Sequence, residues 1–295
     1  MMSLDFRFSS PVEVLDLPIL RDHKVHVSVK RDDLIHPFIS GNKWRKLKYI
    51  LTQAHEGRKS TLVTFGGAWS NHLLATACAG AKFGFKTHGF VRGEPVQNPV
   101  LAMCRLYGME LQFVDRTSYR DKKKLFNENF HVRDAVYIGE GGFSSSALQG
   151  CAEIVQELPQ KYDHIFVASG TGTTVAGLAA GVLQKNLATR VHSVPVLKGG
   201  DFLKNDVQTL GIDPEKITFH TDYHFGGYAK YTPELLAFVK DFVQRTGMMI
   251  EPTYTGKAFY ALLDLVQQDY FAPDDHLLIV HTGGLTGFLG MFEKF

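Results

Sequence analysis

The feature of this chain that most constrains its fold is a regular alternation of short apolar runs with longer helical patterns. We predict strands at Thr61–Phe65, Thr87–Val91, Glu110–Val114, Ala135–Ile138, His164–Ala168, Arg190–Val196 and His276–His281. The stretches predicted to be helical are Trp44–Ala54, Asn71–Lys82, Pro99–Tyr107, Ala147–Glu157, Val175–Gln184, Pro233–Arg245 and Lys257–Gln268. Parallel strands need long crossover connections, usually helices. This order therefore predicts an α/β fold of parallel sheets covered by helices on both faces.

Two glycine-rich junctions suggest how the 295 residues divide into domains. Phe65–Gly67 and Gly139–Gly142 bracket a block of strand–helix units in the first half of the chain. A chain of this length can form one large domain or two moderate ones. We therefore predict a larger α/β domain made of residues 1–57 and 153–295. A smaller α/β domain, residues 58–152, is inserted in it, which places both junctions near the cleft between the two.

Composition excludes several classes of partner. The chain has 32 Lys and Arg against 30 Asp and Glu, a net charge of +2, so it lacks the basic surface expected of a protein that binds nucleic acid or anionic membranes. No apolar run reaches the about 18 residues of a membrane span. Asp5 and Arg7 stand where a signal peptide would need its apolar core. We expect a cytoplasmic protein with no nucleic-acid or membrane partner.

Metal binding is not expected either. The three cysteines are too few and too scattered for a disulfide framework or a cysteine zinc site. His220 and His224 have the spacing of a zinc helix, but they lack the Glu of a metalloprotease and lie beside Gly226 and Gly227. This segment is predicted to be strand and loop, where that spacing does not put both rings on one face.

The strongest candidate for binding an anion is the segment Val167–Gly177, which follows a predicted strand and opens a helix. Its glycines allow close approach of the backbone, and the N–H groups of a first helical turn have no partner within the helix. A dinucleotide site would want an acidic residue at the end of the next strand, where this chain has Lys198. No Gly-Lys-Ser/Thr follows, which excludes a P-loop. A single phosphate, as in pyridoxal phosphate, fits better; a tight turn without a ligand stays open.

Two further segments carry candidate chemistry. Lys43 follows a Gly-Asn turn at the start of a predicted helix, close to Arg45 and Lys46. The helix dipole and these cations disfavour its ammonium form, and Schiff-base chemistry needs such a lysine. Taken alone, the segment favours an ordinary solvated helix start, and Lys43 gains weight only in combination with the phosphate loop. Ser70 and Asn71 come at another helix start, where backbone N–H groups can hold a carboxylate or where one side chain simply caps the helix.

Taken together, the motifs resemble a known family. The segments in question are SGNKWRKLKY around Lys43, GGAWSNH, the SGTGTTVAGL loop, Tyr254–Lys257 and His281–Gly284. They are similar to the pyridoxal-phosphate enzymes of the 1-aminocyclopropane-1-carboxylate deaminase and D-cysteine desulfhydrase family. The resemblance runs from about Val29 to Gly287. It implies a two-domain, three-layer parallel-sheet fold, that of the tryptophan synthase β-like (fold type II) enzymes, with the cofactor between the domains.

The resemblance also implies roles for individual residues. Lys43 would form the Schiff base with pyridoxal 5′-phosphate, and Asn71 would bond the 3′-oxygen of the cofactor. Ser70, Tyr228 and Tyr254 would join Lys43 in catalysis. The phosphate would lie on the backbone of Gly170, Thr171, Gly172, Thr173 and Thr174, and the substrate carboxylate on Lys46, Ser70, Asn71 and His72. A homodimer is likewise implied by the resemblance.

One position separates the two activities of the family. The deaminase has a Glu directly after the second tyrosine, facing the pyridine nitrogen, whereas this chain has Thr255 there and Thr282 after His281. The two threonines match the desulfhydrase pattern and favour β-elimination of a good leaving group over cyclopropane ring opening.

We therefore expect a lyase acting on D-cysteine or a similar small D-amino acid to give a 2-oxo acid and ammonia, with 1-aminocyclopropane-1-carboxylate deaminase as the alternative. A second alternative is a cofactor-carrying binding protein without turnover. It rests on Gly141–Leu148, where the chain lacks the family's proline and carries Phe143.

Overall fold

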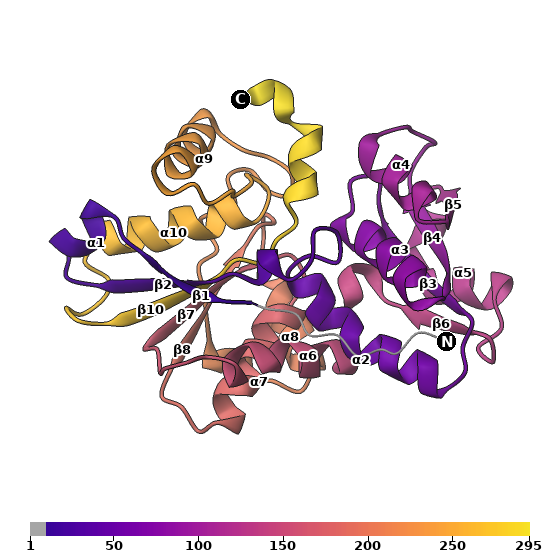
Figure 1. Cartoon of the computed structure of the whole chain (residues 1–295), viewed down its shortest axis with the longest axis horizontal. Helices are drawn as coiled ribbons and strands as arrows, with labels where there is room; N and C mark the ends of the chain where they lie inside the picture. The colour runs from indigo at the N-terminus through magenta and orange to yellow at the C-terminus, as the bar shows by residue number, and fades with distance from the viewer. Residues whose placement is uncertain (1–9) are drawn as a thin grey trace.

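The computed structural model describes residues 10–295, so Asp5 and Arg7 lie outside the described residues. Two β-sheets lie side by side, each covered by helices (Figure 1). The larger sheet has the order β1 (Val12–Leu15), β2 (His26–Lys30), β10 (His276–Val280), β7 (His164–Ser169), β8 (Arg190–Pro195) and β9 (Ile217–Phe219). The smaller has the order β5 (Met109–Val114), β4 (Lys86–Arg92), β3 (Thr61–Gly67) and β6 (Ala135–Ile138). Every strand pair except β1–β2 is parallel, which confirms the predicted α/β class.

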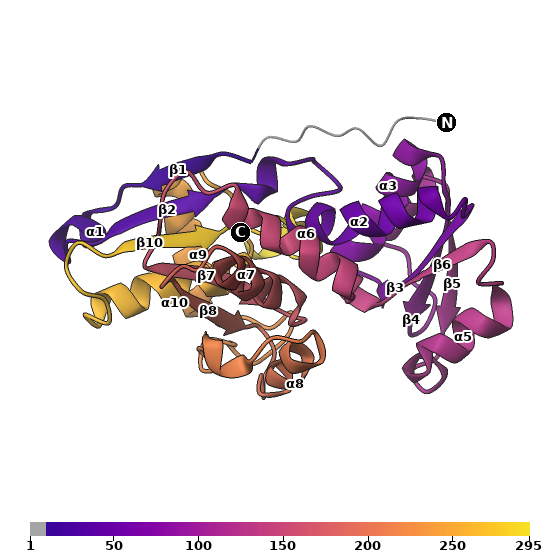
Figure 2. The same ribbon diagram turned by 90° about the horizontal axis from the view of Figure 1, so that it is seen from below.

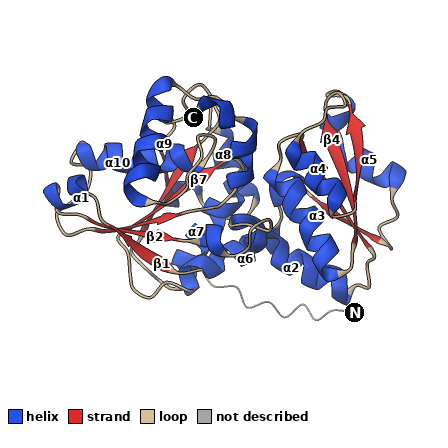
Figure 3. Ribbon diagram, turned by 45° about the horizontal axis from the view of Figure 1, so that its top comes forward, coloured by secondary structure: helices blue, strands red, loops and turns tan. Residues whose placement is uncertain are grey.

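Helices cover both faces of each sheet (Figures 2 and 3). Their bounds are α1 Pro18–Asp22, α2 Asn42–Glu56, α3 Asn71–Phe83, α4 Pro99–Leu106, α5 Lys122–Asn129, α6 Ser145–Gln156, α7 Thr173–Gln184, α8 Phe202–Thr209, α9 Pro233–Thr246 and α10 Thr255–Gln267. Alternation along β7 shows the three layers: Phe166 packs in the core with α9 and α10, and Val167 packs in the core with α6 and α7. None of the helices within residues 10–295 has the length and apolar character to cross a membrane.

The sequence patterns missed six elements, namely β1, β2, β9, α1, α5 and α8. All are short or polar and owe their form to neighbours. Helix α5 begins in the charged run Arg120–Lys124, where Asp121 accepts a hydrogen bond from Lys124 N and Phe126 supplies the one buried side chain. Such a segment has little periodicity of its own, because packing on the sheet, not propensity, stabilises it.

Helix α2 connects the two sheets. Its buried residues Leu47 and Leu51 pack in one core with Leu62 of β3, while α6 approaches so closely that a Cβ on Gly150 would lie 1.9 Å from Arg45 O. All strands of the smaller sheet lie between residues 61 and 138. We keep the division into 1–57 with 153–295, and 58–152, as a proposal, with α2 as the element that packs on both units.

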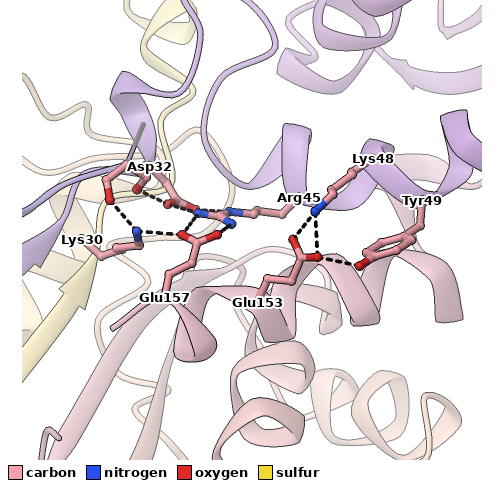
Figure 4. Close-up of polar contacts among 8 residues, drawn as sticks. Lys30, Asp32, Arg45, Lys48, Tyr49, Glu153 and Glu157 are labelled. Atoms are coloured by element: carbon pink, nitrogen blue, oxygen red, sulfur yellow. Dashed lines mark hydrogen bonds and ion pairs between the residues drawn. The ribbon is translucent and has the colours of Figure 1, made fainter. Parts of the chain in front are cut away.

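An ion cluster at the start of α2 ties this helix to the larger unit (Figure 4). Arg45 Nη2 lies 2.9 Å from Asp32 Oδ1 and 2.8 Å from Glu157 Oε2, and Lys30 Nζ lies 2.9 Å from the same glutamate oxygen. Asp32 is fully buried and Arg45 is 4% exposed. Burial lowers the pKa of Arg45, but the two carboxylates outweigh it and raise the pKa overall. Arg45 is therefore a fixed, neutralised cation two residues from Lys43.

Candidate active site

A cavity of about 820 Å³ lies where the carboxyl ends of the parallel strands of both sheets converge. Its walls include Gly67 at the end of β3, Arg92 at the end of β4, Gly170 after β7 and Thr282 after β10. Ligands of open α/β sheets bind at this edge. The predicted site residues that line the cavity are Lys43, Lys46, Ser70, Asn71, His72, Gly170, Thr171, Thr174, Tyr228, Tyr254 and Thr282.

Lys43 lies in the first turn of α2, whose start is held against the end of β10. Gly41 has φ +58°, and a Cβ there would lie 1.8 Å from Thr282 O, so only glycine fits this turn. Asn42 Nδ2 donates to Thr174 Oγ1 at 3.0 Å, which joins the turn to α7. Among residues 10–295, the Lys43 Nζ has no hydrogen-bond or ion-pair partner. Burial first, and then the charge of Lys46, hold the pKa of Lys43 well below its usual range.

The pKa of Lys43 is lowered as the sequence predicted, but its main cause is a different one. A lowered pKa was expected from the helix dipole and two neighbouring cations, but Arg45 is neutralised by Asp32 and Glu157. Desolvation is the largest cause instead. A half-buried, unbonded amine with a lowered pKa can be neutral near neutral pH, which is the form that condenses with an aldehyde.

Lys46 joins the two halves of the cavity wall. Its buried Nζ donates to Gly141 O at 3.0 Å and to Thr171 Oγ1 at 3.3 Å, and burial lowers its pKa. Phe143, the bulky residue at which this loop departs from the family, does not line the cavity. Through Gly141, Lys46 instead connects this altered loop to the segment predicted to hold phosphate.

The segment Gly170–Thr174 has the geometry of an anion cradle at the N-terminus of α7. Gly170 passes so close to Tyr254 that a Cβ would lie 2.8 Å from its ring. Thr171 and Thr174 line the cavity, whereas Gly172 faces α8, where a Cβ would lie 2.9 Å from the Cβ of Asp206. Thr173 is buried, and its Oγ1 has no partner among the described residues. The first-turn N–H groups have no partner within the helix.

The turn before α3 presents three consecutive polar residues. Ser70 caps the helix, because its Oγ accepts from Leu73 N at 3.3 Å, and it lines the cavity as well. Asn71 Oδ1 accepts from Thr286 Oγ1 at 2.6 Å. His72 is buried and lies 2.8 Å from Thr64 Oγ1 through Nε2, while its Nδ1 has no partner in the described part of the chain.

The neighbours of His72 decide its protonation. The hydroxyl of Thr64 donates to Ile138 O at 3.1 Å and therefore accepts from His72 Nε2–H. Burial, followed by the charges of Lys43 and Lys46, holds the pKa of His72 well below its usual range. The imidazole is neutral, with a lone pair on Nδ1 as an acceptor at the cavity wall.

Two tyrosines face each other across the opening of the cavity. The rings of Tyr228 and Tyr254 are 5.8 Å apart in an edge-on arrangement. Burial raises the pKa of both phenols, most strongly that of Tyr254. The more exposed Tyr228 is 45% exposed and is therefore the one that can meet an entering ligand.

Lys257 and Glu251 are site residues that sequence reasoning missed. Lys257 is 0% exposed and donates to His224 O and Gly227 O, both at 2.8 Å, which holds the loop that carries Tyr228. Burial lowers the pKa of Lys257 to about 8. Glu251 lies in the cavity wall and caps α10. The available signal was the sequence EPTYTGK, with an acidic residue just before a helix start and a lysine inside its first turn.

Of the two threonines predicted to contact the ring nitrogen, Thr255 does not line the cavity. Its Oγ1 accepts from Glu251 N at 2.9 Å, because Thr255 is the first residue of α10. The carboxylate of Glu251 accepts from Tyr254 N at 2.7 Å and from Thr255 N at 3.0 Å. Burial raises the pKa of Glu251, and these N–H donors act in the opposite direction. Thr282 does line the cavity.

The histidine pair predicted not to bind metal has separate partners. His220 Nε2 lies 2.9 Å from His192 Nδ1, and His224 Nδ1 accepts from Gly226 N at 2.9 Å. No group of three or more His, Cys, Asp or Glu side chains within residues 10–295 could hold a metal ion.

Comparison with known proteins agrees with this geometry. Residues 8–283 match the model of the family described as pyridoxal-phosphate dependent enzyme. A provisionally named 1-aminocyclopropane-1-carboxylate deaminase of Pyrococcus horikoshii is 31% identical over 95% of this chain and 90% of its own length. The bifunctional D-cysteine desulfhydrase/1-aminocyclopropane-1-carboxylate deaminase of Arabidopsis thaliana is 30% identical over 97% of this chain and 78% of its own length.

A solved structure described as an ACC deaminase homologue has the same fold. It superposes with a TM-score of 0.83 at 28% identity, and the match covers 98% of this chain and 93% of that one.

Proposed function

The chain belongs to the family of pyridoxal-phosphate-dependent enzymes, and on that premise we propose that it is a lyase that releases a 2-oxo acid and ammonia from a small amino acid. The amino acid we propose is D-cysteine or a similar D-amino acid. The observation that carries the proposal is the unbonded amine of Lys43, with its lowered pKa, in one cavity with the Gly170–Thr174 loop.

The residues present fit the family's cofactor, pyridoxal 5′-phosphate. The backbone N–H groups of Gly170–Thr174 would hold its phosphate, Asn71 its 3′-oxygen and Lys43 its aldehyde carbon. Thr282 would lie at the ring nitrogen, and Thr255 stays a proposed contact that needs its hydroxyl to leave Glu251. When bound, the cofactor withdraws electrons from the Cα of the substrate and so weakens its C–H bond.

The chain's own side chains supply the proton transfers. Lys43, in its neutral form, can take the proton from Cα, and its amine has no competing partner to hold it back. Ser70 and Asn71 would face the substrate's carboxylate end, where Lys46 supplies positive charge, and His72, whose Nδ1 lone pair can only accept a hydrogen bond, would face a donor group of the substrate. The hydroxyls of Tyr228 and Tyr254, whose raised pKa keeps them protonated, can donate a proton to the leaving sulfur. The net reaction is D-cysteine and water to pyruvate, hydrogen sulfide and ammonia.

Ring opening of 1-aminocyclopropane-1-carboxylate is the second candidate, because both curated relatives above carry that activity in their names. The threonine at position 255 argues against it. Turnover is favoured over a binding protein without activity, since Phe143, the departure behind that alternative, lies outside the cavity wall.

The decisive experiment is an assay of D-cysteine, L-cysteine and 1-aminocyclopropane-1-carboxylate for 2-oxo acid release. We expect D-cysteine to be turned over fastest, and Lys43→Ala to lose both turnover and the visible absorbance of the bound cofactor. Bound cofactor without release from any of the three would contradict the proposal. We also propose that the protein is cytoplasmic and, from the family resemblance, that it forms a homodimer. Gel filtration with light scattering tests the oligomeric state.

A further inference from the structure

A second hollow, of about 370 Å³, adjoins the cavity on the side of the smaller sheet. We call it the arginine vestibule; it is lined by Arg92, Arg116, Tyr119, Arg120 and Lys122. These residues come from the end of β4, the connection after β5 and the start of α5. Arg92 and Arg116 line the larger cavity as well, so the two hollows share a wall.

The vestibule concentrates positively charged side chains in a protein whose net charge is small. In the part of the chain that the structure describes, Arg92, Arg116 and Arg120 form no ion pair, and Lys122 lies 3.2 Å from Glu140. Four of the five residues that line it are cations and none is a carboxylate, whereas the whole chain carries a net charge of only +2. The nearby carboxylates of Asp115 and Asp121 accept from backbone N–H groups of Thr117 and Lys124 instead.

Tyr119 holds two of the cations in place. This buried ring has Lys122 Nζ 4.7 Å from its centroid and the guanidinium carbon of Arg92 at 5.6 Å, both within the range of cation–π attraction. A side chain that is already positioned loses less conformational entropy when it binds a ligand. The vestibule is thus a prepared binding surface for an anion, because its three arginines form no ion pair with the described residues and two of its cations are held by Tyr119.

Arg92 brings this charge to the substrate end of the cavity. Its Nη2 lies 3.9 Å from the position a Cβ would take on Gly67, in the turn that leads to Ser70 and Asn71. Across the cavity, its charge also acts on Tyr228, where it lowers the pKa against the larger effect of burial. A ligand whose carboxylate end lies on Ser70 and Asn71 can therefore reach Arg92 with its side chain.

We propose that the arginine vestibule is a subsite for the substrate's side chain, and that, beyond D-cysteine, the enzyme binds small amino acids whose side chain carries a second negative charge better than their neutral counterparts. A carboxylate, sulfonate or phosphate ester would serve, since guanidinium groups bind all three in the same forked geometry. The inference rests on the proposed function, because it takes Ser70 and Asn71 as the anchor for the substrate's own carboxylate.

The proposal can be tested by comparing the binding of aspartate and asparagine, whose side chains differ in charge but have nearly the same shape. Calorimetric titration of the cofactor-loaded protein should give aspartate at least ~10-fold tighter binding than asparagine at low salt, in whichever enantiomer binds. The preference should shrink as salt rises. Arg92→Gln combined with Arg116→Gln should abolish the difference in affinity between aspartate and asparagine. Arg105→Gln combined with Arg133→Gln, two exposed arginines outside the vestibule, removes the same charge and should leave the preference intact.

Three results would overturn the inference. One is equal binding of aspartate and asparagine to the loaded wild-type protein. Another is an aspartate preference that survives in the Arg92/Arg116 variant. The third is inorganic sulfate binding to the vestibule without competing with aspartate, which would make the hollow an anion site unconnected with the substrate. Failure of the proposed function is separate, since it shows as absent cofactor absorbance or absent 2-oxo acid release.

Discussion

Lys257 Nζ donates to Gly227 O at 2.8 Å, directly before Tyr228 in the chain. A fully buried ammonium thus holds the loop that carries an exposed active-site phenol. It also donates to Val196 O at 3.3 Å, at the end of β8, so the loop is tied to the sheet through one side chain. Bonds within the loop and a lysine on another element therefore together hold Tyr228.

Replacing Lys257 with Met should loosen this loop. The substitution leaves the carbonyls of His224 and Gly227 without their donor, at about 1–3 kcal/mol per buried group. We expect faster amide exchange over residues 222–230 and a lower kcat with little change in cofactor content. Lys240→Met, at an exposed position on α9, is the matched control. Unchanged exchange in Lys257→Met would show that the loop holds itself.

The ion cluster at the start of α2 should matter more for stability than its neighbours on the surface. Arg45→Met leaves Asp32 buried and unpaired, which should lower the free energy of unfolding by about 3–5 kcal/mol. Lys48→Met removes the half-exposed pair with Glu153 on the same helix and should cost about 0–1 kcal/mol. Urea denaturation of both variants gives the comparison. Equal losses would refute the difference.

Lys46 should tune the pH at which the protein takes up its cofactor. Uptake needs neutral Lys43, so its rate should rise with pH as that amine loses its proton. The charge of Lys46 lowers the pKa of Lys43, and Lys46→Met should therefore move the rise to higher pH. Burial is the larger cause, so the pKa should stay below its usual value. Stopped-flow absorbance with pyridoxal phosphate measures the profile, with Lys48→Met as control; a shift to lower pH would contradict the assignment.

Gly41 and Gly84 separate backbone strain from steric conflict. Both have positive φ, +58° and +77°, but a Cβ on Gly84 meets nothing within 4 Å. Gly84→Ala should cost about 1–2 kcal/mol, the strain of a left-handed residue. Gly41→Ala adds the clash with Thr282 O and should displace the start of α2, so that Lys43 no longer takes up cofactor. Thermal unfolding and cofactor absorbance distinguish the two; equal behaviour would mean that the turn can move.

The sequence by itself determined the parts of the protein that depend on neighbours along the chain. Periodicity predicted the parallel strands β3 to β8 and β10, because a buried parallel strand must be apolar over its whole length. The glycine-rich loop at Gly170 and the lysine at a helix start could also be predicted from the sequence, because each lies within one continuous segment. Ser70 was correctly placed at a helix start, where it caps α3 and lines the cavity, while carboxylate binding there stays a prediction.

The tertiary structure decided what depends on residues far apart in the chain. From the sequence, Arg45 is one more cation beside Lys43, whereas in the folded chain Asp32 and Glu157 neutralise its charge. The sequence predicts that Thr255 contacts the cofactor ring, whereas in the folded chain its hydroxyl accepts a hydrogen bond from Glu251 N. The charges of the arginine vestibule are unremarkable in a chain of net charge +2, and only folding brings Arg92 and Arg116 beside the cavity. A local pattern records the backbone's own preferences, whereas desolvation and charge pairing depend on partners that only the folded chain brings together.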